Sequence, residues 1–222
     1  MPLAPAVPVA PRAGRLWNRF GGLLGELARR LEIDGASCAA VLFVESEGRF
    51  FGPDGRMVIR FENHRFWKYW GKSHPDRFHR HFRFGSKKRW EGHAFRREGE
   101  RRWRRFHGRQ EREWAAFGLA RSFDETAAML SISMGAPQIL GENHGRIGYA
   151  SVEEMFEAFS GSERSQILGL FDFLGGVNRG GPMVEALRRG DFFAFARLYN
   201  GPGRAAAYAR SIRRAHRAFC PG

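Results

Sequence analysis

The sequence predicts a mainly α-helical protein with one domain and a small β-hairpin. Apolar residues recur three and four positions apart over most of the chain, which is the spacing of one helix face. Asp or Ser residues that can cap a helix precede several of these runs. One Gly-Pro-Asp-Gly turn has short apolar runs on both sides. With 222 residues, 43% of them hydrophobic, the chain can build one well-packed core.

The N-terminal third is expected to hold two helices after a flexible leader. Residues 1–14 are rich in Pro and Ala, and their prolines would break the apolar stretch of a signal peptide. Residues 15–33 have the pattern of an amphipathic helix, and the domain proper is predicted to span 15–222. Asp34 can cap a second helix at 35–47, which is apolar on every side. Such a helix belongs in the middle of a domain.

The hairpin follows, and then a segment without clear periodicity. Residues 49–62 predict two short strands about the turn, and residues 64–71 predict a short aromatic helix. Residues 72–107 are rich in Arg, His, Trp and Phe and are expected to form an irregular basic, aromatic insertion.

The second half of the chain returns to helical periodicity, with caps at Asp124, Ser151 and Ser162. Residues 134–149 form a glycine-bearing connection within it. The predicted helices lie at about 108–123, 124–133, 151–159, 162–174, 181–190, 191–201 and 204–218.

Charge limits the kinds of partner. The formal net charge is +14, and residues 65–112 contribute 17 Lys and Arg against 5 Asp and Glu, a net of +12. A charge of this size indicates polyanionic partners such as an anionic bacterial cell wall, a membrane surface or nucleic acid. Tryptophans interleave with the basic residues, which is typical of sites that bind nucleic-acid bases or sugars, but a solvated loop pinned by its aromatic rings is an equal alternative. No apolar run of about 18 residues exists, so no transmembrane segment is predicted.

No metal or cofactor is predicted. Cys38 and Cys220 are expected to be free thiols, with Cys38 in the core. His79 and His81 are close together, but no cysteine lies near them and their spacing matches no known zinc pattern. The sequence has no P-loop, dinucleotide fingerprint, G-x-S-x-G elbow or H-E-x-x-H motif.

Two glutamates end the apolar helix, and one of them is a candidate catalytic acid. A glycosidase needs one carboxyl group that stays protonated near neutral pH and a second acid across the cleft. Burial and the negative end of the helix dipole would both raise the pKa of an acid in this position. Helical spacing puts both Glu45 and Glu47 beside apolar residues, so it does not choose between them. The alternative is that both simply face water.

Other polar residues near the hairpin have simpler interpretations. Asp54 could be the second acid, but Pro-Asp-Gly is also a common turn. Glu62 and His64 follow an apolar strand, where a strand-to-helix junction capped by Asn63 would also explain them.

Four segments, taken in order, resemble the N-acetylmuramidase domain of phage endolysins and related peptidoglycan hydrolases. They are CAAVLFVESEGRFFGPDGR with VIRFENHRFW, then AMLSISMGAPQILGENHGRIGYASVEEMFEAF, SQILGLFDFL and DFFAFARLYNGPGRAAAYA. The pieces V-E-S-x-G and S-x-G-x-x-Q-I-x-G are modest singly, but their order makes them specific. The resemblance implies a lysozyme-like fold.

The resemblance also implies roles for individual residues. Glu45 matches the family's general acid, and position 47 is often glycine in the family. Asp54 lies nine residues later, where related phage lysozymes have a second acid, but Arg60 replaces the threonine expected after it. Glu62 is the other candidate for the second acid. The implied substrate-binding residues are His64, Gly135, Gln138, Tyr199 and Asn200, with Ile139 beside Gln138 and a departure from the common aromatic residue at Glu142.

The implied function is hydrolysis of the β-1,4 bond between N-acetylmuramic acid and N-acetylglucosamine in peptidoglycan, by inversion or retention. The implied partners are peptidoglycan and the anionic wall surface, with no specific nucleic acid. The protein would be made in the cytoplasm without a signal peptide and would act on the wall after release or delivery. The alternative is a non-catalytic module that binds anionic wall polymer or nucleic acid on a lysozyme-like fold.

Overall fold

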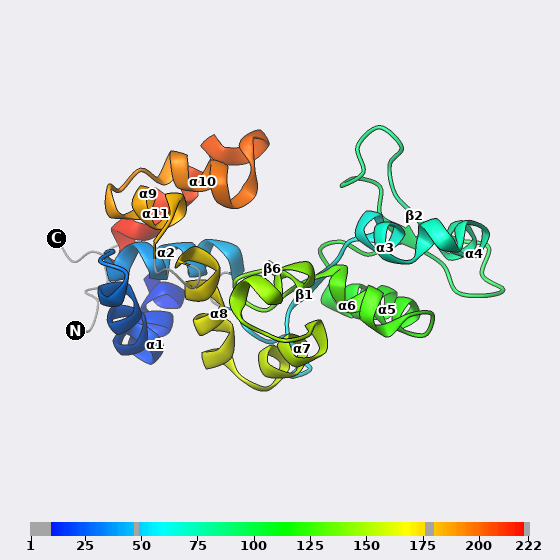
Figure 1. The fold of residues 1–222 in the computed structure, drawn as a ribbon, viewed down its shortest axis with the longest axis horizontal. Helices are drawn as coiled ribbons and strands as arrows, with labels where there is room; N and C mark the ends of the chain where they lie inside the picture. Colours follow the sequence, from blue (N-terminus) through cyan, green and yellow to red (C-terminus); the bar gives the residue numbers. More distant parts are fainter. Residues whose placement is uncertain (1–9, 47–48, 176–179, 220–222) are drawn as a thin grey trace. The chain divides into compact units, whose positions relative to one another are not determined.

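The structure is a computed structural model that describes residues 10–46, 49–175 and 180–219 (Figure 1). The chain forms two compact units. The helical unit takes in the chain up to Phe50, residues 146–148 and the chain from Glu163 onward, and the mixed unit takes in Phe51–Gly145 and Tyr149–Ser162. Most described residues are helical, which confirms the predicted mainly α fold class.

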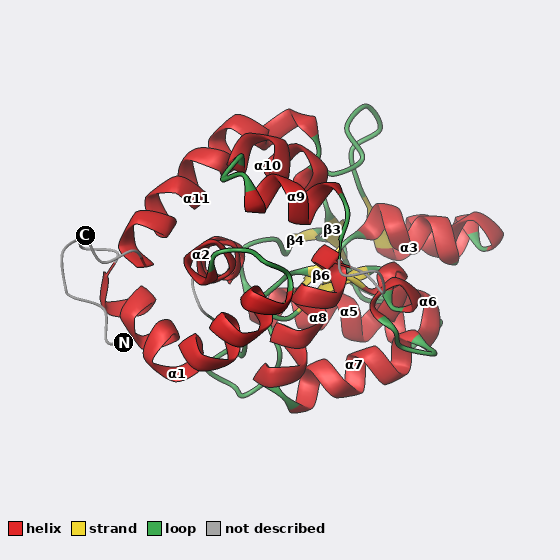
Figure 2. Cartoon of the chain, turned by 60° about the vertical axis from the view of Figure 1, so that its left-hand side comes forward, coloured by secondary structure: helices red, strands yellow, loops and turns green. Residues whose placement is uncertain are grey.

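The helical unit is built around one apolar helix. Its helices are α1 (Ala10–Arg30), α2 (Gly35–Ser46), α8 (Glu163–Gly175), α9 (Pro182–Arg188), α10 (Phe192–Asn200) and α11 (Ala205–Phe219). Helix α2 packs on α1 and α11, and Figure 2 shows it end-on with these two helices beside it. Residues 36–42 of α2 are all buried, including the free thiol of Cys38. The predicted central helix is therefore confirmed.

Asp34 fixes the start of α2, as predicted. Its carboxylate accepts hydrogen bonds from the backbone N–H groups of Ala36 (2.9 Å) and Ser37 (3.0 Å). It also contacts His216 Nε2 of α11 at 2.6 Å. The hydrogen bond with His216 is the largest influence and holds the pKa of Asp34 well below its usual value. One residue thus caps α2 and ties the C-terminal helix to it.

Helices α1 and α11 are amphipathic. α1 buries Leu16, Leu24 and Ala28, while α11 buries one residue about every turn. α1 begins at Ala10, inside the segment predicted to be a flexible leader, because its apolar stripe already starts at Ala13. Residues 1–9 lie outside the described part of the chain. No helix in the described part is long and apolar enough to cross a membrane.

The mixed unit contains the sheet that carries the predicted hairpin segment. Strands β1 (Ile59–Phe61), β5 (Ile132–Met134) and β6 (Ile139–Leu140) pair antiparallel in the order β1-β5-β6. The predicted turn is present, closed by a single bridge between Phe51 and Met57. Beyond this bridge the chain pairs with β5, more than 70 residues away, which local spacing did not reveal.

Side chains of helix α5 (Gln110–Arg121) cover the free edge of β1. Gln110 accepts from Ile59 N (2.9 Å) and donates to Ile59 O (2.8 Å). The buried carboxylate of Glu113 accepts from Phe61 N at 2.9 Å. An uncovered edge would leave these backbone groups without partners, so α5 takes the place of a fourth strand.

Residues 72–107, expected to be irregular, contain a short helix and a second sheet. Helix α4 (Pro75–His81) leads into strands β2 (Phe82–Arg83), β3 (Ala94–Phe95) and β4 (Arg104–Arg105), which pair antiparallel in this order. Two-residue strands show no alternation of polar and apolar residues, so the pattern gave no signal for them. The phenylalanines of this region instead bury a shared aromatic core with β1 and α3: Phe61, Phe66, Phe78, Phe82, Phe95 and Phe106.

The remaining helices of the mixed unit are α3 (Asn63–Tyr69), α6 (Glu125–Leu130) and α7 (Val152–Gly161). Asp124 and Ser151 cap α6 and α7 as predicted, accepting from Ala127 N (2.8 Å) and Glu154 N (3.2 Å). The helix predicted at 124–133 ends at Leu130, because the next residues form β5 in the middle of the sheet.

Candidate active site

Glu45 lies in the last turn of α2, and its carboxyl group is half-buried. Its Oε1 atom accepts a hydrogen bond from the Tyr208 hydroxyl of α11 and a long one from Asn200 Nδ2, at the end of α10 (3.5 Å). Two consecutive helices, α10 and α11, therefore reach one oxygen atom of a glutamate that lies more than 150 residues earlier in the chain.

The segment Tyr-Asn-Gly-Pro-Gly explains why α10 ends beside Glu45. Gly201 has φ 79°, a left-handed conformation that glycine adopts without strain, and it stops α10 after Asn200. Pro202 then opens a single 3-10 turn, Pro202–Arg204, that leads into α11. The tyrosine rings pack together, with Tyr199 stacked on Phe195 at 5.3 Å and on Tyr208 at 6.3 Å between centroids. The turn and the stack fix both partners of Glu45.

The environment of Glu45 favours its protonated form. Burial raises its pKa from the usual 4.5 to about 7, although the hydrogen bonds from Tyr208 and Asn200 act in the opposite direction. Burial and the nearby Glu45 charge both raise the pKa of Tyr208, so this hydroxyl keeps its proton and donates it in the hydrogen bond. A carboxyl group with a pKa near 7 can release a proton to a substrate at neutral pH. Glu47, the other candidate in this helix end, lies outside the described residues.

Asp54 has the contacts of a turn residue. It is exposed in the mixed unit, and its carboxylate accepts from Arg56 N (3.1 Å) and pairs with the Arg56 guanidinium (2.6 Å). The hydrogen bond from the Arg56 side chain is the largest of several effects that lower the pKa of Asp54. This carboxylate is therefore ionised, and it stabilises its own turn.

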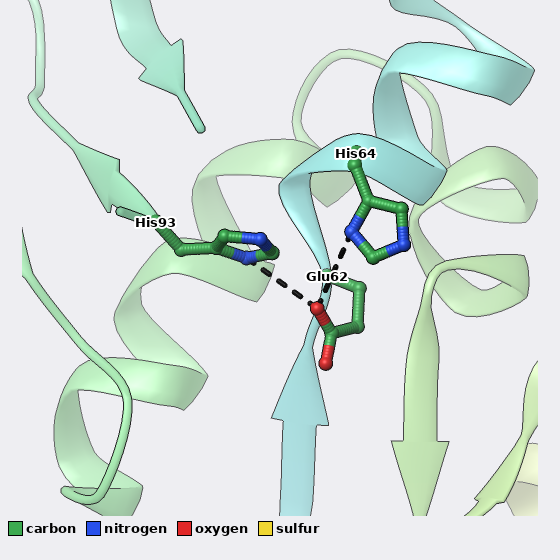
Figure 3. A group of neighbouring side chains, drawn as sticks. All are labelled: Glu62, His64 and His93. Atoms are coloured by element: carbon green, nitrogen blue, oxygen red, sulfur yellow. Dashed lines mark ion pairs between the residues drawn. The ribbon is translucent and has the colours of Figure 1, made fainter. Parts of the chain in front are cut away.

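Glu62 directly follows β1 and meets two histidines (Figure 3). Its Oε1 accepts from Arg60 Nε at 2.7 Å, while Oε2 lies 3.4 Å from His64 Nδ1 and 3.5 Å from His93 Nδ1. Burial alone would raise the pKa of Glu62, but the contact with His64 and the charge of Arg60 outweigh it and lower the pKa to about 2. Glu62 is thus a stable carboxylate, unlike Glu45.

The predicted substrate-binding residues Gly135 and Gln138 shape the turn between β5 and β6. Gly135 has φ 66° and donates its N–H to Val58 O at 2.8 Å. Gln138 has φ 50°, a conformation that costs about 1–2 kcal/mol for a residue with a side chain, and its amide donates to Gly135 O at 2.8 Å. Strained residues of this kind concentrate at functional sites, which supports the prediction for Gln138 without testing it.

Glu142, His79 and His81 each contact neighbouring residues. Glu142 pairs with Arg65 (2.7 Å) and Lys68 (2.9 Å) and accepts from the Tyr69 hydroxyl. His81 is buried between Arg96 O (3.0 Å) and Glu98 (3.2 Å), and His79 is exposed beside the Trp67 ring. The two histidines weighed in the sequence as metal ligands thus have separate roles.

Two residues that touch the candidate acids were not singled out from the sequence. Tyr208 lies in the last of the four segments that resemble muramidases. The sequence could have indicated it only through its position, one turn into the helix that follows the Tyr-Asn-Gly-Pro-Gly turn. His93 lies about 30 residues from Glu62 in a region without periodicity, so only the fold brings it there.

Comparisons with known proteins agree with this geometry. Residues 34–220 match the N-acetylmuramidase family. The crystal structure of the Burkholderia AP3 phage endolysin is similar, with a TM-score of 0.68 and 28% sequence identity over 88% of this chain and 69% of that one. No curated protein matches the chain. The chain belongs to the N-acetylmuramidase family and is a glycoside hydrolase that acts on peptidoglycan.

Proposed function

We propose that the protein cleaves the β-1,4 bond between N-acetylmuramic acid and N-acetylglucosamine, with Glu45 as the general acid. The observation that carries this proposal is the half-buried carboxyl group at the end of α2, whose pKa is raised to about 7 by burial. An acid of this strength is half protonated near neutral pH, and it can donate to a glycosidic oxygen as the oxocarbenium-like state develops.

The hydrogen bonds of Glu45 suggest which oxygen carries the proton. Both Tyr208 and Asn200 donate to Oε1, so Oε2 is the atom that would donate to the leaving group. After transfer, the same two donors would stabilise the carboxylate that remains. Tyr208 therefore acts as a positioning residue.

Asp54 and Glu62 are the proposed candidates for the second acid. Both are held as carboxylates, Asp54 by Arg56 and Glu62 by His64 and Arg60. The second acid must be a carboxylate, because it stabilises the oxocarbenium-like state or activates water. Asp54→Asn and Glu62→Gln separate the two, because only the residue with this role should lose most of the clearing rate.

His64, Gly135, Gln138, Tyr199 and Asn200 are the proposed substrate contacts. Asn200 has an exposed side-chain amide next to Glu45, which suits an acetamido or hydroxyl group of a sugar. Its partner in the motif, Tyr199, is half-buried and holds the tyrosine stack.

The basic segment 65–112 is the proposed contact with the anionic wall. Several of its aromatic rings are used internally: Trp70 is buried, and Arg83 and Arg96 both lie 4.6 Å from the Trp103 ring. The guanidinium groups leave a strongly positive surface, and its attraction to the wall should weaken as salt is added. We place the action at the cell wall, after release or delivery from the cell that makes the protein.

The test is clearing of purified peptidoglycan, followed by mass spectrometry of the released muropeptides. Wild type should clear the suspension and release fragments with N-acetylmuramic acid at the reducing end. Glu45→Gln should clear about 10²–10⁴ times more slowly, the usual loss for a general acid. Glu26→Gln is the matched control, because Glu26 is a partly exposed acid of α1 that pairs only with Arg29 and Arg30 among the described contacts.

Three outcomes would contradict the proposal. Fragments that end in N-acetylglucosamine would assign the other glycosidic bond. Equal clearing by Glu45→Gln and wild type would remove Glu45 from the mechanism. An inactive wild type that still sediments with cell walls would favour a non-catalytic binding module.

A further inference from the structure

We infer that Glu62, His64 and His93 form a zinc-binding site in the mixed unit. Each offers one ligand atom, and the three atoms lie within 4.8 Å of one another. Figure 3 shows the two imidazole rings approaching the same carboxylate oxygen from different elements, one from the start of α3 and one from the segment before β3.

Two of the three separations between ligand atoms fit a tetrahedral ion. Glu62 Oε2 is 3.4 Å from His64 Nδ1 and 3.5 Å from His93 Nδ1. Zinc binds histidine nitrogen and carboxylate oxygen at about 2.0–2.1 Å, and tetrahedral bonds of this length place neighbouring ligand atoms about 3.4 Å apart. An ion can therefore sit between the carboxylate and either ring without a large movement of the side chains.

Two of the ligand atoms lack a hydrogen bond among the described residues. Glu62 Oε2 and His64 Nδ1 are both buried from solvent, and apart from their 3.4 Å approach to each other neither atom has such a partner. Buried polar atoms of folded proteins nearly always have a partner, so a missing one calls for an explanation. A cation bound between the two atoms would supply it to both.

The outer contacts of these side chains already have the arrangement that metal ligands require. His93 Nε2 donates to Arg89 O at 2.8 Å, which leaves the lone pair on Nδ1, the atom that faces Glu62. The N–H of Asn63 donates to this same Nδ1 at 3.3 Å, which shows an unprotonated nitrogen, and an ion bound to Nδ1 would replace this long hydrogen bond. Arg60 holds the other oxygen of Glu62 at 2.7 Å. Such contacts fix the direction of ligands in metal sites.

A cavity borders this cluster on the side of His93. It has a volume of about 650 Å³, and its lining includes His93, His107 and the loop from Gly85 to Gly92. Zinc sites with three protein ligands keep a fourth position open, and a fourth ligand would enter from this side. Three cations, Lys87, Lys88 and Arg105, line the cavity against one acid, Glu91, so an anionic fourth ligand is favoured.

The ligand types select the metal. Two imidazoles and one carboxylate suit zinc and related transition metals, whereas Mg²⁺ and Ca²⁺ prefer oxygen ligands alone. If the ion binds Glu62 and His64, the carboxylate is not available to a sugar, and His64 could contact substrate only through its other ring nitrogen, Nε2. Asp54 then becomes the remaining candidate for the second acid.

The test is metal binding by the full chain, measured without reference to hydrolysis. The protein is treated with a chelator, and CoCl₂ or ZnCl₂ is then added while calorimetry and visible absorption are recorded. Wild type should bind one ion per chain, give the intense visible bands of tetrahedral Co²⁺, lose them when Zn²⁺ is added, and gain thermal stability with Zn²⁺.

Matched variants make the assignment specific. His64→Ala, His93→Ala and Glu62→Gln should each bind Co²⁺ at least tenfold more weakly, while the exposed His79→Ala should bind as wild type does. Circular dichroism checks that each variant is folded, and Glu62→Gln serves if the alanine variants are not. No binding by wild type, or unchanged binding by the folded cluster variants, would overturn the inference. Because hydrolysis is not measured, failure here is distinct from failure of the role proposed for Glu45.

Discussion

Glu45 in the helical unit and Glu62 in the mixed unit have similar settings and opposite proton affinities. Glu45 lies in the last turn of a helix and Glu62 directly after a strand, both are half-buried, and burial by itself favours a higher pKa for each. Glu45 has two neutral donors, Tyr208 and Asn200, and its pKa rises to about 7. Glu62 has Arg60 and two imidazoles, and its pKa falls to about 2. The neighbouring charges, rather than burial, thus decide which acid holds a proton.

The largest effect expected from this difference is on stability. Folding raises the pKa of Glu45 from 4.5 to about 7, so the folded state binds this proton more tightly than the unfolded state does. The stability it contributes is fully present below pH 4.5 and is lost as pH rises through 7. At about 1.4 kcal/mol per pKa unit, the loss is at most about 3 kcal/mol.

Glu45→Gln tests this by removing the titrating group. The free energy of unfolding of this variant, measured in urea from pH 4 to 8, should exceed that of wild type at pH 8 by up to about 3 kcal/mol and should approach it at pH 4. Glu26→Gln should differ from wild type by a constant amount from pH 5 to 8, because its arginine partners lower the pKa of Glu26 and this acid is ionised throughout that range. A constant difference between Glu45→Gln and wild type would mean that Glu45 does not hold an extra proton in the fold.

The next effect concerns hydrolysis. If Glu45 must be protonated to act, the initial clearing rate at low substrate should fall about tenfold per pH unit above pH 7, or about a hundredfold by pH 9. The measurement is the clearing rate in buffers of constant ionic strength, since salt also changes binding to the wall. The fall of the rate at high pH is the alkaline limb of the pH profile. If this limb began near pH 4 to 5, Glu45 would titrate like an exposed acid and would not be the proton donor.

The third prediction concerns a substitution that removes hydrogen bonds beside the Glu62 cluster and does not touch Glu45. Asn63 is fully buried and donates to Arg83 O (2.7 Å) and Ala94 O (2.9 Å), which joins α3 to the second sheet. Asn63→Ala leaves both carbonyls without this donor and should lower the free energy of unfolding by roughly 2 kcal/mol. Asn18→Ala, in the exposed face of α1, is the control.

The clearing rate of Asn63→Ala should fall over the same high-pH range as that of wild type, because the contacts of Asn63 do not involve Glu45. A shifted limb would mean that the proton affinity of Glu45 depends on the second sheet.

The sequence predicted the helical unit better than the mixed unit for a physical reason. Helices are specified locally, so the cap at Asp34 and the apolar run of α2 could be recognised from their own residues, and the dipole argument placed a carboxyl group at the right helix end. It could not choose between Glu45 and Glu47, because the deciding contacts come from Tyr208 and Asn200, more than 150 residues away. The resemblance, not the periodicity, singled out Glu45.

In the mixed unit the deciding contacts are all long-range. β1 pairs with β5 instead of completing a local hairpin, and the second sheet is held by an aromatic core that has no sequence period. His93 reaches Glu62 only through this fold, so the cluster could not be predicted from the spacing of histidines along the chain.

The smallest effect would come from Tyr208→Phe, which changes one neighbour of Glu45. The hydrogen bond from Tyr208 stabilises the charged carboxylate and lowers its pKa, so its removal should raise the pKa of Glu45 further. The alkaline limb of the clearing rate should then move to higher pH. Tyr69→Phe removes a hydroxyl that binds Glu142 and should not move the limb. A limb that moves to lower pH in Tyr208→Phe would mean that this hydroxyl favours the protonated acid, and the comparison between neutral and charged neighbours would not explain Glu45.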